Sequence, residues 1–223
     1  MNTNVIRRLV QVFLTLFIQG VILFVAAGTL FWKWAWILLL LSVVILIINL
    51  LIIPVELIEE RGRLKKDAKK WDKVLTSINI IPTILLYVCS GLDYRFNLTG
   101  NVDIVINITG LVLSFSGAML FTWSMISNKF FSTLVRLQTD RKHTVATGGP
   151  YRFVRHPGYV GYIIMSFATP MALGTLWGLI FSGITGILLI IRTALEDNTL
   201  KRELAGYAEY AEKVKYRLIP FLW

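Results

Sequence analysis

The feature that most constrains the fold of this chain is a series of apolar stretches, each about as long as a lipid bilayer is thick. A helix needs roughly 20 apolar residues to cross the hydrocarbon core. Such stretches lie at about 9–31, 34–53, 74–92 and 102–127, and a closely spaced pair follows at 157–173 and 176–191. Only a helix or a closed barrel satisfies its backbone hydrogen bonds in lipid, so the many Ile and Val residues indicate lipid contact. The sequence predicts an all-α polytopic transmembrane bundle of about six spans, the last two forming a tight hairpin.

The distribution of charge gives this bundle an orientation. The chain is 56% hydrophobic and contains 23 Lys and Arg residues, for a net charge of +10. Six spans place both termini on one side, and if that side is cytoplasmic, 21 of the 23 basic residues fall in cytoplasmic segments. Only Lys33 and Arg95 lie on the other side, which agrees with the known preference of Lys and Arg for cytoplasmic loops. We therefore expect an integral, multi-pass membrane protein with both termini in the cytoplasm, and no nucleic-acid partner.

Three further patterns concern the membrane surface. The basic loop at 61–73, RGRLKKDAKKWDK, either attracts anionic lipid headgroups or is a solvated segment that holds the topology. Tryptophans near the span ends are expected at the membrane interface, namely Trp32, Trp34, Trp36, Trp71 and Trp223. Apolar residues near the carboxyl terminus repeat at intervals of four and three, namely Leu200, Leu204, Tyr207, Ala211 and Val214. This repeat predicts a C-terminal amphipathic cytoplasmic helix, which acts either as a lid or as surface packing.

The whole chain, 1–223, is predicted to form a single membrane-embedded domain. Four spans occupy 1–127, which carry no recognisable motif, and 128–223 contain a polar loop, the hairpin and the terminal helix. Positions near the middle of the predicted spans are almost all apolar, whereas a transporter normally places functional polar groups there. Chemistry is therefore expected at one surface of the bundle.

Two polar clusters at that surface are candidates for a functional site. The stretch HTVATGGPYRFVRHPGYVGY at 143–162 holds both histidines of the chain among glycines, which permit a backbone to approach a ligand closely. The alternative is a turn-rich re-entry into the membrane, in which Arg152 and Arg155 extend toward water and His156 caps a helix. The second cluster is Arg192 and Glu196, four residues apart on one helical face, for which the alternative is a weak intrahelical ion pair.

The ordered motifs of 131–220 resemble the isoprenylcysteine carboxyl methyltransferase family and the related phospholipid methyltransferases. The resemblance rests on GGPYRFVRHPGYVG, a short helical hairpin, and then RTALEDNTL, GYAEY and VKYRLIP. It implies S-adenosylmethionine as cofactor and a cofactor pocket formed by His143, Thr144, Val145, Ala146, Tyr151, His156, Pro157, Gly158, Tyr159 and Glu196. It also implies that Arg192 faces the methyl acceptor as the catalytic residue. In one departure, Arg136 stands where eukaryotic members have a cofactor-contacting glutamine, with Gln138 nearby.

The expected reaction is an in-line methyl transfer to a lipophilic acceptor at the cytoplasmic face, which depends on alignment and exclusion of water and needs no metal. A carboxylate acceptor, such as that of an isoprenylcysteine, is already ionised and needs a cation such as Arg192 to orient it. A phospholipid amine must lose a proton, so Glu196, His156 or Tyr159 would then be the general base. The acceptor itself is not fixed by the sequence.

Two other classes of function remain open. Membrane sterol reductases share part of this architecture, although they have an asparagine before the tyrosine where this chain reads His156, Pro157, Gly158 and Tyr159. A reductase of that kind would use NADPH. A non-enzymatic transporter or scaffold would use its basic loops to bind lipid. The expected partners are the membrane and a lipid or prenylated substrate, with no obligate protein partner.

Overall fold

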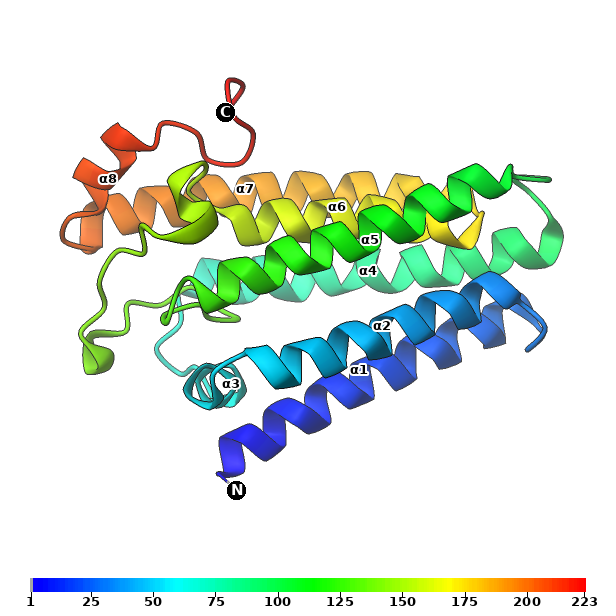
Figure 1. The fold of residues 1–223 in the computed structure, drawn as a ribbon, viewed down its shortest axis with the longest axis horizontal. Helices are drawn as coiled ribbons and strands as arrows, with labels where there is room; N and C mark the ends of the chain where they lie inside the picture. Colours follow the sequence, from blue (N-terminus) through cyan, green and yellow to red (C-terminus); the bar gives the residue numbers. More distant parts are fainter. Residues whose placement is uncertain (1) are drawn as a thin grey trace.

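The structure is a computed structural model that describes residues 2–223 and is built from helices (Figure 1). Within these residues there are eight α-helices, three short 3-10 helices and no strand. The α-helices are α1 (Thr3–Ala27), α2 (Lys33–Ile52), α3 (Val55–Gly62), α4 (Lys70–Phe96), α5 (Ile104–Ile126), α6 (Pro157–Leu173), α7 (Leu179–Glu203) and α8 (Tyr207–Lys213). The 3-10 helices are η1 (Thr139–Arg141), η2 (Gly149–Arg152) and η3 (Leu176–Gly178). The predicted all-helical fold class is confirmed.

The long helices run side by side along the length of the molecule (Figure 1). Among residues 2–223, five helical segments are long and apolar enough to cross a membrane: α1, α2, α4, α5 and 176–203, which joins η3 to α7. The remaining predicted span, 157–173, is helix α6, which has 17 residues and packs between α5 and α7. The apolar stretches of the sequence therefore correspond to helices of an integral membrane protein.

Connections at the two ends of the bundle differ in length and composition (Figure 1). Short connections at 28–32, 97–103 and 174–178 lie at one end. The longer segments, α3 with the loop after it, the 127–156 loop, and α8 with the chain terminus, lie toward the other end. This second end carries most of the basic residues, because Lys33 and Arg95 flank the short connections.

Helix ends follow local sequence signals. The side chain of Asp103 accepts a hydrogen bond from the Val105 amide at 2.8 Å and so caps the start of α5. Pro157 is the first residue of α6, where its fixed φ suits the helix and its missing N–H costs nothing. Gly174 ends the same helix with a φ of 72°, a conformation that favours glycine.

Helices α5 and α6 pack closely because small residues face each other along their contact. A Cβ added at Gly161 would lie 2.5 Å from the carbonyl oxygen of Gly117, and one at Gly110 would lie 2.2 Å from the amide nitrogen of Ala172. Small residues at such contacts let two backbones approach and gain dispersion energy in lipid, where the hydrophobic effect does not drive association. The glycine at 161 therefore serves helix packing and not ligand binding.

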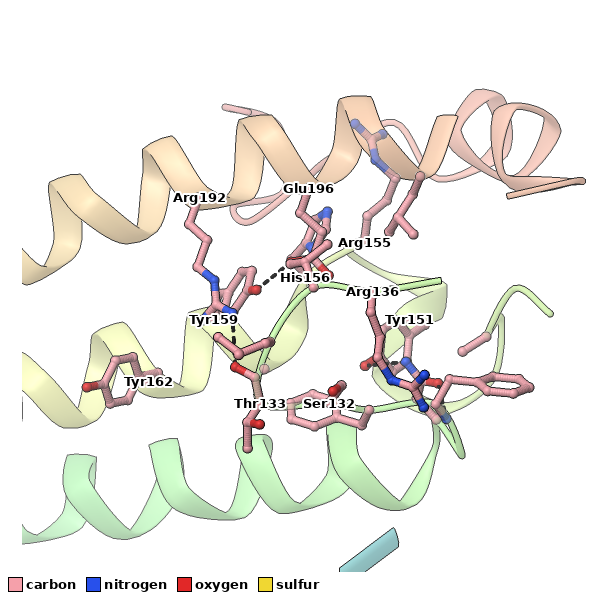
Figure 2. A pocket seen from close by; sticks show the side chains of 18 of the residues that line it. Ser132, Thr133, Arg136, Tyr151, Arg155, His156, Tyr159, Tyr162, Arg192 and Glu196 are labelled. Atoms are coloured by element: carbon pink, nitrogen blue, oxygen red, sulfur yellow. Dashed lines mark hydrogen bonds between the residues drawn. The ribbon is translucent and has the colours of Figure 1, made fainter. Parts of the chain in front are cut away.

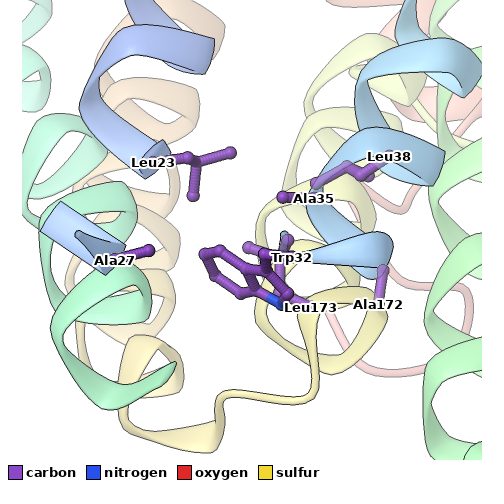
Figure 3. Close-up of a cluster of buried hydrophobic side chains, with 7 residues drawn as sticks. All are labelled: Leu23, Ala27, Trp32, Ala35, Leu38, Ala172 and Leu173. Atoms are coloured by element: carbon purple, nitrogen blue, oxygen red, sulfur yellow. The ribbon is translucent and has the colours of Figure 1, made fainter. Parts of the chain in front are cut away.

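A buried cluster closes the bundle at the end of the short connections (Figure 3). Trp32 is 1% exposed and stacks on Tyr94 with ring centroids 4.4 Å apart. The cluster joins α1, α2 and the end of α6, and comprises Leu23, Ala27, Trp32, Ala35, Leu38, Ala172 and Leu173. The ring of Trp32 therefore fills the space between these three helices and does not project outward from the bundle.

The segment between α2 and α4 is more structured than a solvated loop. Helix α3, which the sequence analysis did not predict, lies against α1, and a Cβ added at Gly62 would lie 1.9 Å from the carbonyl oxygen of Asn4. Lys65 is buried and forms an ion pair with Glu60 at 3.3 Å, and Asp72 is fully buried. The interpretation of 61–73 as a simply solvated segment is therefore wrong for these residues.

The carboxyl-terminal segment is not one continuous helix. Helix α7 extends to Glu203, the chain turns through Gly206 at a φ of 80°, and α8 has only 7 residues. The predicted apolar face nevertheless contributes to a core, because its Leu204 and Tyr207 pack with Tyr151 and with Tyr210, which the repeat did not include. The repeat thus identified Leu204 and Tyr207 correctly as buried, and its other members, Leu200, Ala211 and Val214, are partly buried against them. The glycine at 206 interrupts the helix that would have carried them.

Candidate functional site

A cavity of about 310 Å³ opens at the basic end of the bundle. Its walls come from α1, α3, α4, α5, the 128–146 loop, the segment 151–156, α6, α7 and α8, so it joins both halves of the chain. The lining includes these residues predicted from the motifs: His143, Thr144, Val145, Ala146, Tyr151, His156, Gly158, Tyr159, Arg192 and Glu196. Pro157 is not among them, because it is fully buried at the start of α6. Figure 2 shows the polar side chains that point into this space.

Arg192 is held by the amino-terminal half of the chain. Its Nε and Nη2 atoms donate to the two carboxylate oxygens of Asp72 on α4 at 2.7 and 3.0 Å, and Nη2 also donates to the Thr133 carbonyl at 3.1 Å. The guanidinium lies 5.2 Å from the centroid of the Tyr159 ring (Figure 2). The alternative of an ion pair between Arg192 and Glu196 is wrong, because no such pair lies within 4.0 Å among the described residues.

Glu196 on α7 contacts α6 directly. The Tyr159 hydroxyl donates a short hydrogen bond to its Oε2 atom (Figure 2). The ring of His156 is parallel to that of Tyr159, with centroids 5.7 Å apart. The motif on α6 and the acid on α7 therefore meet in one wall, with Arg192 one helical turn away from Glu196.

Asp197 organises the side of the cavity that faces α8, a role that the sequence analysis missed. It is fully buried and accepts two hydrogen bonds from Arg155 at 2.7 and 3.0 Å, one from Arg217 at 3.0 Å and one from the Tyr207 hydroxyl at 3.0 Å. The expectation that Arg155 extends toward water is wrong, because it is 5% exposed and bound to this carboxylate. The acidic pair in the LEDN stretch was the available sequence signal, although it does not reveal which partners each acid takes.

His156 lies between this network and the cavity. It occupies the position before α6, but its side chain makes no capping hydrogen bond. Its Nε2 atom lies 3.4 Å from the Tyr207 hydroxyl and 3.6 Å from Asp197 Oδ1. The helix-capping alternative is therefore wrong for the His156 side chain.

His143 lies on the 128–146 loop beside an aromatic ring and two cations. The backbone amide of Gln138 donates to the Nδ1 atom of His143 at 3.3 Å. The centroid of the His143 ring lies 4.4 Å from that of the Phe130 ring. Partial burial, with the charges of Arg136 and Arg141, lowers the pKa of His143 to about 4. The imidazole is therefore neutral at physiological pH and offers its Nε2–H as a donor.

Arg136 and Gln138 differ in their relation to the cavity. Arg136 lines it, but its guanidinium is bound to Glu60 at 3.0 Å, Asp67 at 2.7 Å and Asp140 at 3.2 Å. Gln138 is 1% exposed, is not part of the lining, and donates to the Phe130 carbonyl at 2.6 Å. Both side chains hold the loop in place in this structure.

The lining combines polar and apolar surface. Phenylalanines and leucines from four segments lie beside the charged groups, namely Leu75, Phe121, Phe130, Phe131, Leu188, Leu189, Leu200 and Leu204. A Cβ added at Gly158 would lie 2.8 Å from the Phe131 ring, so this glycine lets the aromatic side chain seat against α6. Among residues 2–223 no group of His, Cys, Asp and Glu is placed to hold a metal ion. The site is suited to an amphiphilic ligand.

A polytopic helical membrane protein with an amphiphilic cavity at one end is the class that the fold and site define. Residues 105–205 match the family model described as phospholipid methyltransferase. The chain is also 28% identical over 116 residues to protein-S-isoprenylcysteine O-methyltransferase B of Arabidopsis thaliana, which covers 51% of this chain and 58% of that protein. Over 126 residues it is 32% identical to methanethiol S-methyltransferase 1 of Bradyrhizobium diazoefficiens, covering 51% of this chain and 42% of that protein.

These matches confirm the family resemblance that the motifs predicted. Within the carboxyl-terminal half, the chain is similar to isoprenylcysteine carboxyl methyltransferases and related phospholipid methyltransferases. A third relative is the Delta(14)-sterol reductase of Schizosaccharomyces pombe, 30% identical over 90 residues, or 39% of this chain and 21% of that protein. The chain spans less than two thirds of the length of each of these relatives. Arg8, Arg61 and the α4 residues of the cavity lie outside the matched family region.

Proposed function

We propose that this protein transfers a methyl group from S-adenosylmethionine to a lipophilic acceptor at the cytoplasmic face of a membrane. The observation that carries the proposal is the cavity itself. Loop residues 143–146, the motif at 156–159 and Glu196 are far apart in the sequence, yet all except Pro157 line one amphiphilic space beside Arg192. The matched family and the methyltransferase names of two relatives support the same reaction. The cytoplasmic location of the cavity is inferred from the basic residues at its end of the bundle, because Lys and Arg are enriched in cytoplasmic segments.

The residues of the carboxyl-terminal half fit the proposed cofactor chemically. Val145, Ala146 and the partly buried His143 offer an apolar and aromatic surface for a nucleoside base. Glu196 places a carboxylate in the same wall, which suits the positively charged sulfur of the cofactor. When bound there, the cofactor would supply a methyl group on a positively charged sulfur.

In the transfer itself, the nucleophilic atom of the acceptor forms a bond to the methyl carbon while the carbon–sulfur bond breaks. The electron pair of that bond stays on sulfur, so S-adenosylhomocysteine is released. The chain has to align the two partners and exclude water, since no proton needs to move when the acceptor is a carboxylate. Arg192 is proposed to orient the acceptor, because Asp72 and Thr133 fix its guanidinium at the cavity wall.

An ionised carboxylate, as in an isoprenylcysteine, is the acceptor that this arrangement supports best. Three arginines line the cavity on the side of the amino-terminal half and α7: Arg8, Arg61 and Arg192. A cationic wall lowers the energy of a bound anion and raises that of a protonated amine. A phospholipid amine acceptor is the second candidate, with Glu196 as the base, because the matched family model carries that description.

Ligand-induced stabilisation tests the proposed cofactor against the reductase alternative. The purified protein in detergent is expected to show a higher melting temperature with S-adenosylhomocysteine and no change with NADPH, because a ligand of the native state stabilises it. Stabilisation by NADPH alone would favour the reductase reading that the sterol reductase match raises.

A transfer assay tests the reaction. Membrane lipids and a prenylated cysteine are each incubated with the protein and S-adenosylmethionine labelled in the methyl group, and labelled products are identified. Arg192→Ala is expected to abolish product formation with little change in cofactor affinity, whereas His156→Ala is expected to weaken cofactor binding. No labelled product from either acceptor class would contradict the proposal.

A further inference from the structure

Unpaired polar groups gather on the amino-terminal side of the cavity. Four lining residues have a buried side-chain atom with no hydrogen-bond partner among residues 2–223: Nη1 of Arg61, Oγ1 of Thr76, Oδ1 of Asn79 and Oγ of Ser132. An unpaired buried polar atom costs about 1–3 kcal/mol, so most such atoms in proteins have a partner. Their concentration in one cavity indicates a ligand that pairs with them.

Arg61, like its neighbour Arg8, differs from the other three arginines of the cavity in having no acid beside it. Arg192 is bound to Asp72, Arg136 to Glu60 and Arg155 to Asp197, whereas no carboxylate lies within 4.0 Å of the Arg61 side chain among the described residues. Instead, its guanidinium lies 5.3 and 5.7 Å from the ring centroids of Phe131 and Phe121. A desolvated cation between aromatic rings is available to an incoming anion.

The fold fixes this guanidinium in position. Gly62 lets the end of α3 contact α1, which brings Arg61 beside Arg8 in the cavity wall. Burial, and after it the charge of Arg8, lowers the pKa of Arg61 to about 9, so the side chain remains cationic at neutral pH. A bound anion would offset both the desolvation of the Arg61 charge and its repulsion by Arg8.

The α4 groups face the same space as the Arg192 ion pair. Asp72, Thr76 and Asn79 are spaced by four and three residues, which places them on one face of the helix. Asp72 holds Arg192, and the next turns of this face present the unpaired hydroxyl and amide oxygen. An acceptor that reaches toward Arg192 would therefore pass these groups.

We propose that Arg61, with Thr76 supporting it, forms the binding site for the anionic group of the methyl acceptor. The ligand chemistry is a carboxylate on a lipophilic chain, held by a charge-assisted hydrogen bond from Arg61 beside the Phe121 and Phe131 rings. Arg61 is thus a specificity-determining residue supplied by the half of the chain outside the matched family region. This inference rests on the proposed methyl transfer and assigns the recognition of the acceptor to a second cation.

The carboxylate of the cofactor is the other possible source of the same chemistry. The proposed cofactor residues lie on the 143–146 loop, α6 and α7, whereas Arg61 and Thr76 belong to α3 and α4. We therefore assign Arg61 to the acceptor. The two possibilities predict different effects of mutating Arg61. If Arg61 binds the carboxylate of the cofactor, the mutation weakens binding of S-adenosylhomocysteine, and if it binds the acceptor, that binding is unchanged.

The test compares an anionic and a neutral lipophilic probe by thermal shift and equilibrium binding. The probes are N-acetyl-S-farnesylcysteine, which has one carboxylate, and its primary amide, which has none. The wild-type protein is expected to prefer the anion by about 10- to 100-fold, the effect of a hydrogen bond to a charged group. Arg61→Gln is expected to remove this preference and to leave binding of the amide and of S-adenosylhomocysteine unchanged.

Matched variants separate recognition from loss of fold. Arg63→Gln removes the same charge two residues away, where the side chain is exposed and bound to Asp140, and is expected to keep the anion preference. Arg61→Lys keeps the charge and should retain part of the preference, and Thr76→Val should reduce it without unfolding the protein.

Three results would overturn the proposal, and they are distinct from failure of the proposed function. An anion preference that survives in Arg61→Gln would overturn it, as would equal or absent binding of the two probes to the wild type. Loss of S-adenosylhomocysteine binding in a folded Arg61→Gln protein would assign the cation to the cofactor instead. If S-adenosylhomocysteine fails to stabilise the wild type, the proposed methyl transfer is contradicted. The role of Arg61 is still tested in that case, because the preference for the anionic probe is measured without cofactor.

Discussion

The Arg192 guanidinium donates to both carboxylate oxygens of Asp72, at 2.7 and 3.0 Å, and so joins α7 to α4 across 120 residues. Asp72 is fully buried, and its Oδ2 atom also accepts a hydrogen bond from the Val135 amide at 2.7 Å. One carboxylate therefore fixes both the proposed catalytic cation and the middle of the 128–146 loop that forms the cavity wall. The amino-terminal spans take part in the site through this ion pair.

Asp72→Asn is predicted to reduce turnover more than cofactor binding. The asparagine side chain has one acceptor oxygen in place of two, so it cannot accept the paired hydrogen bonds that Nε and Nη2 of Arg192 donate, and Arg192 loses its fixed orientation. A misplaced catalytic group can cost about 100-fold in rate, whereas we expect the affinity for S-adenosylhomocysteine to change by less than about threefold. The measurements are kcat with labelled methyl donor and calorimetric binding. Full turnover in Asp72→Asn would show that Arg192 needs no partner.

The sequence predicted the helices well because a single physical requirement, burial of the backbone in lipid, sets their length. Residues 157–173 form α6 as predicted, and Leu204 and Tyr207 pack in one core as their spacing indicated. The short α3 was not predicted, because its 8 residues are too few and too polar to resemble a span. It is nevertheless the element that carries Arg61.

For the site, the motifs predicted which residues of the carboxyl-terminal half meet, but not their partners. Arg192 and Glu196 were predicted to lie together, and both line the cavity, yet they bind Asp72 and Tyr159 and not each other. Asp72 belongs to a basic stretch whose spacing gives no sign of a tertiary contact. Such pairings depend on how distant helices pack, which periodicity along one helix does not encode.

Glu196→Gln is predicted to weaken binding of S-adenosylmethionine by about tenfold and of S-adenosylhomocysteine by less, since only the first carries a positive sulfur. Tyr159→Phe keeps the ring and removes the hydroxyl that donates to Glu196, so it should have a smaller effect on both ligands. Calorimetric titration of each ligand measures the difference. Equal losses for the two ligands would mean that Glu196 does not act on the sulfonium charge.

Asp197→Asn is predicted to destabilise the protein by about 3–5 kcal/mol, because it leaves the buried Arg155 without its charge partner. Glu203→Gln is the matched control on the same helix. Its ion pair with Lys69 is partly exposed and should contribute no more than about 1 kcal/mol. Thermal unfolding in detergent compares the two variants. Similar melting temperatures for both would argue against Asp197 as the centre of the α7–α8 contact.

The stability of the protein is predicted to fall as the pH drops from about 6.5 toward 4, with a contribution from His143. The pKa of its imidazole is about 4 in the folded protein, against an ordinary value of 6.5. Between these values the imidazole of the unfolded chain is protonated and that of the folded protein is not. The free energy of unfolding therefore decreases as the pH falls. The shift corresponds to about 3 kcal/mol, which solvent screening of the partly exposed ring lowers to about 2 kcal/mol. This contribution to stability is fully present above pH 6.5.

His143→Asn isolates this contribution. The asparagine oxygen can still accept the hydrogen bond that the backbone amide of Gln138 donates to Nδ1 of His143, but the asparagine side chain does not titrate. The melting temperature of the variant should therefore decline less than that of the wild type between pH 6.5 and 4, while carboxylates titrate alike in both proteins. Parallel curves over this range would place the proton on His143 equally in the folded and unfolded states, and would contradict a buried, cation-flanked imidazole in the cavity wall.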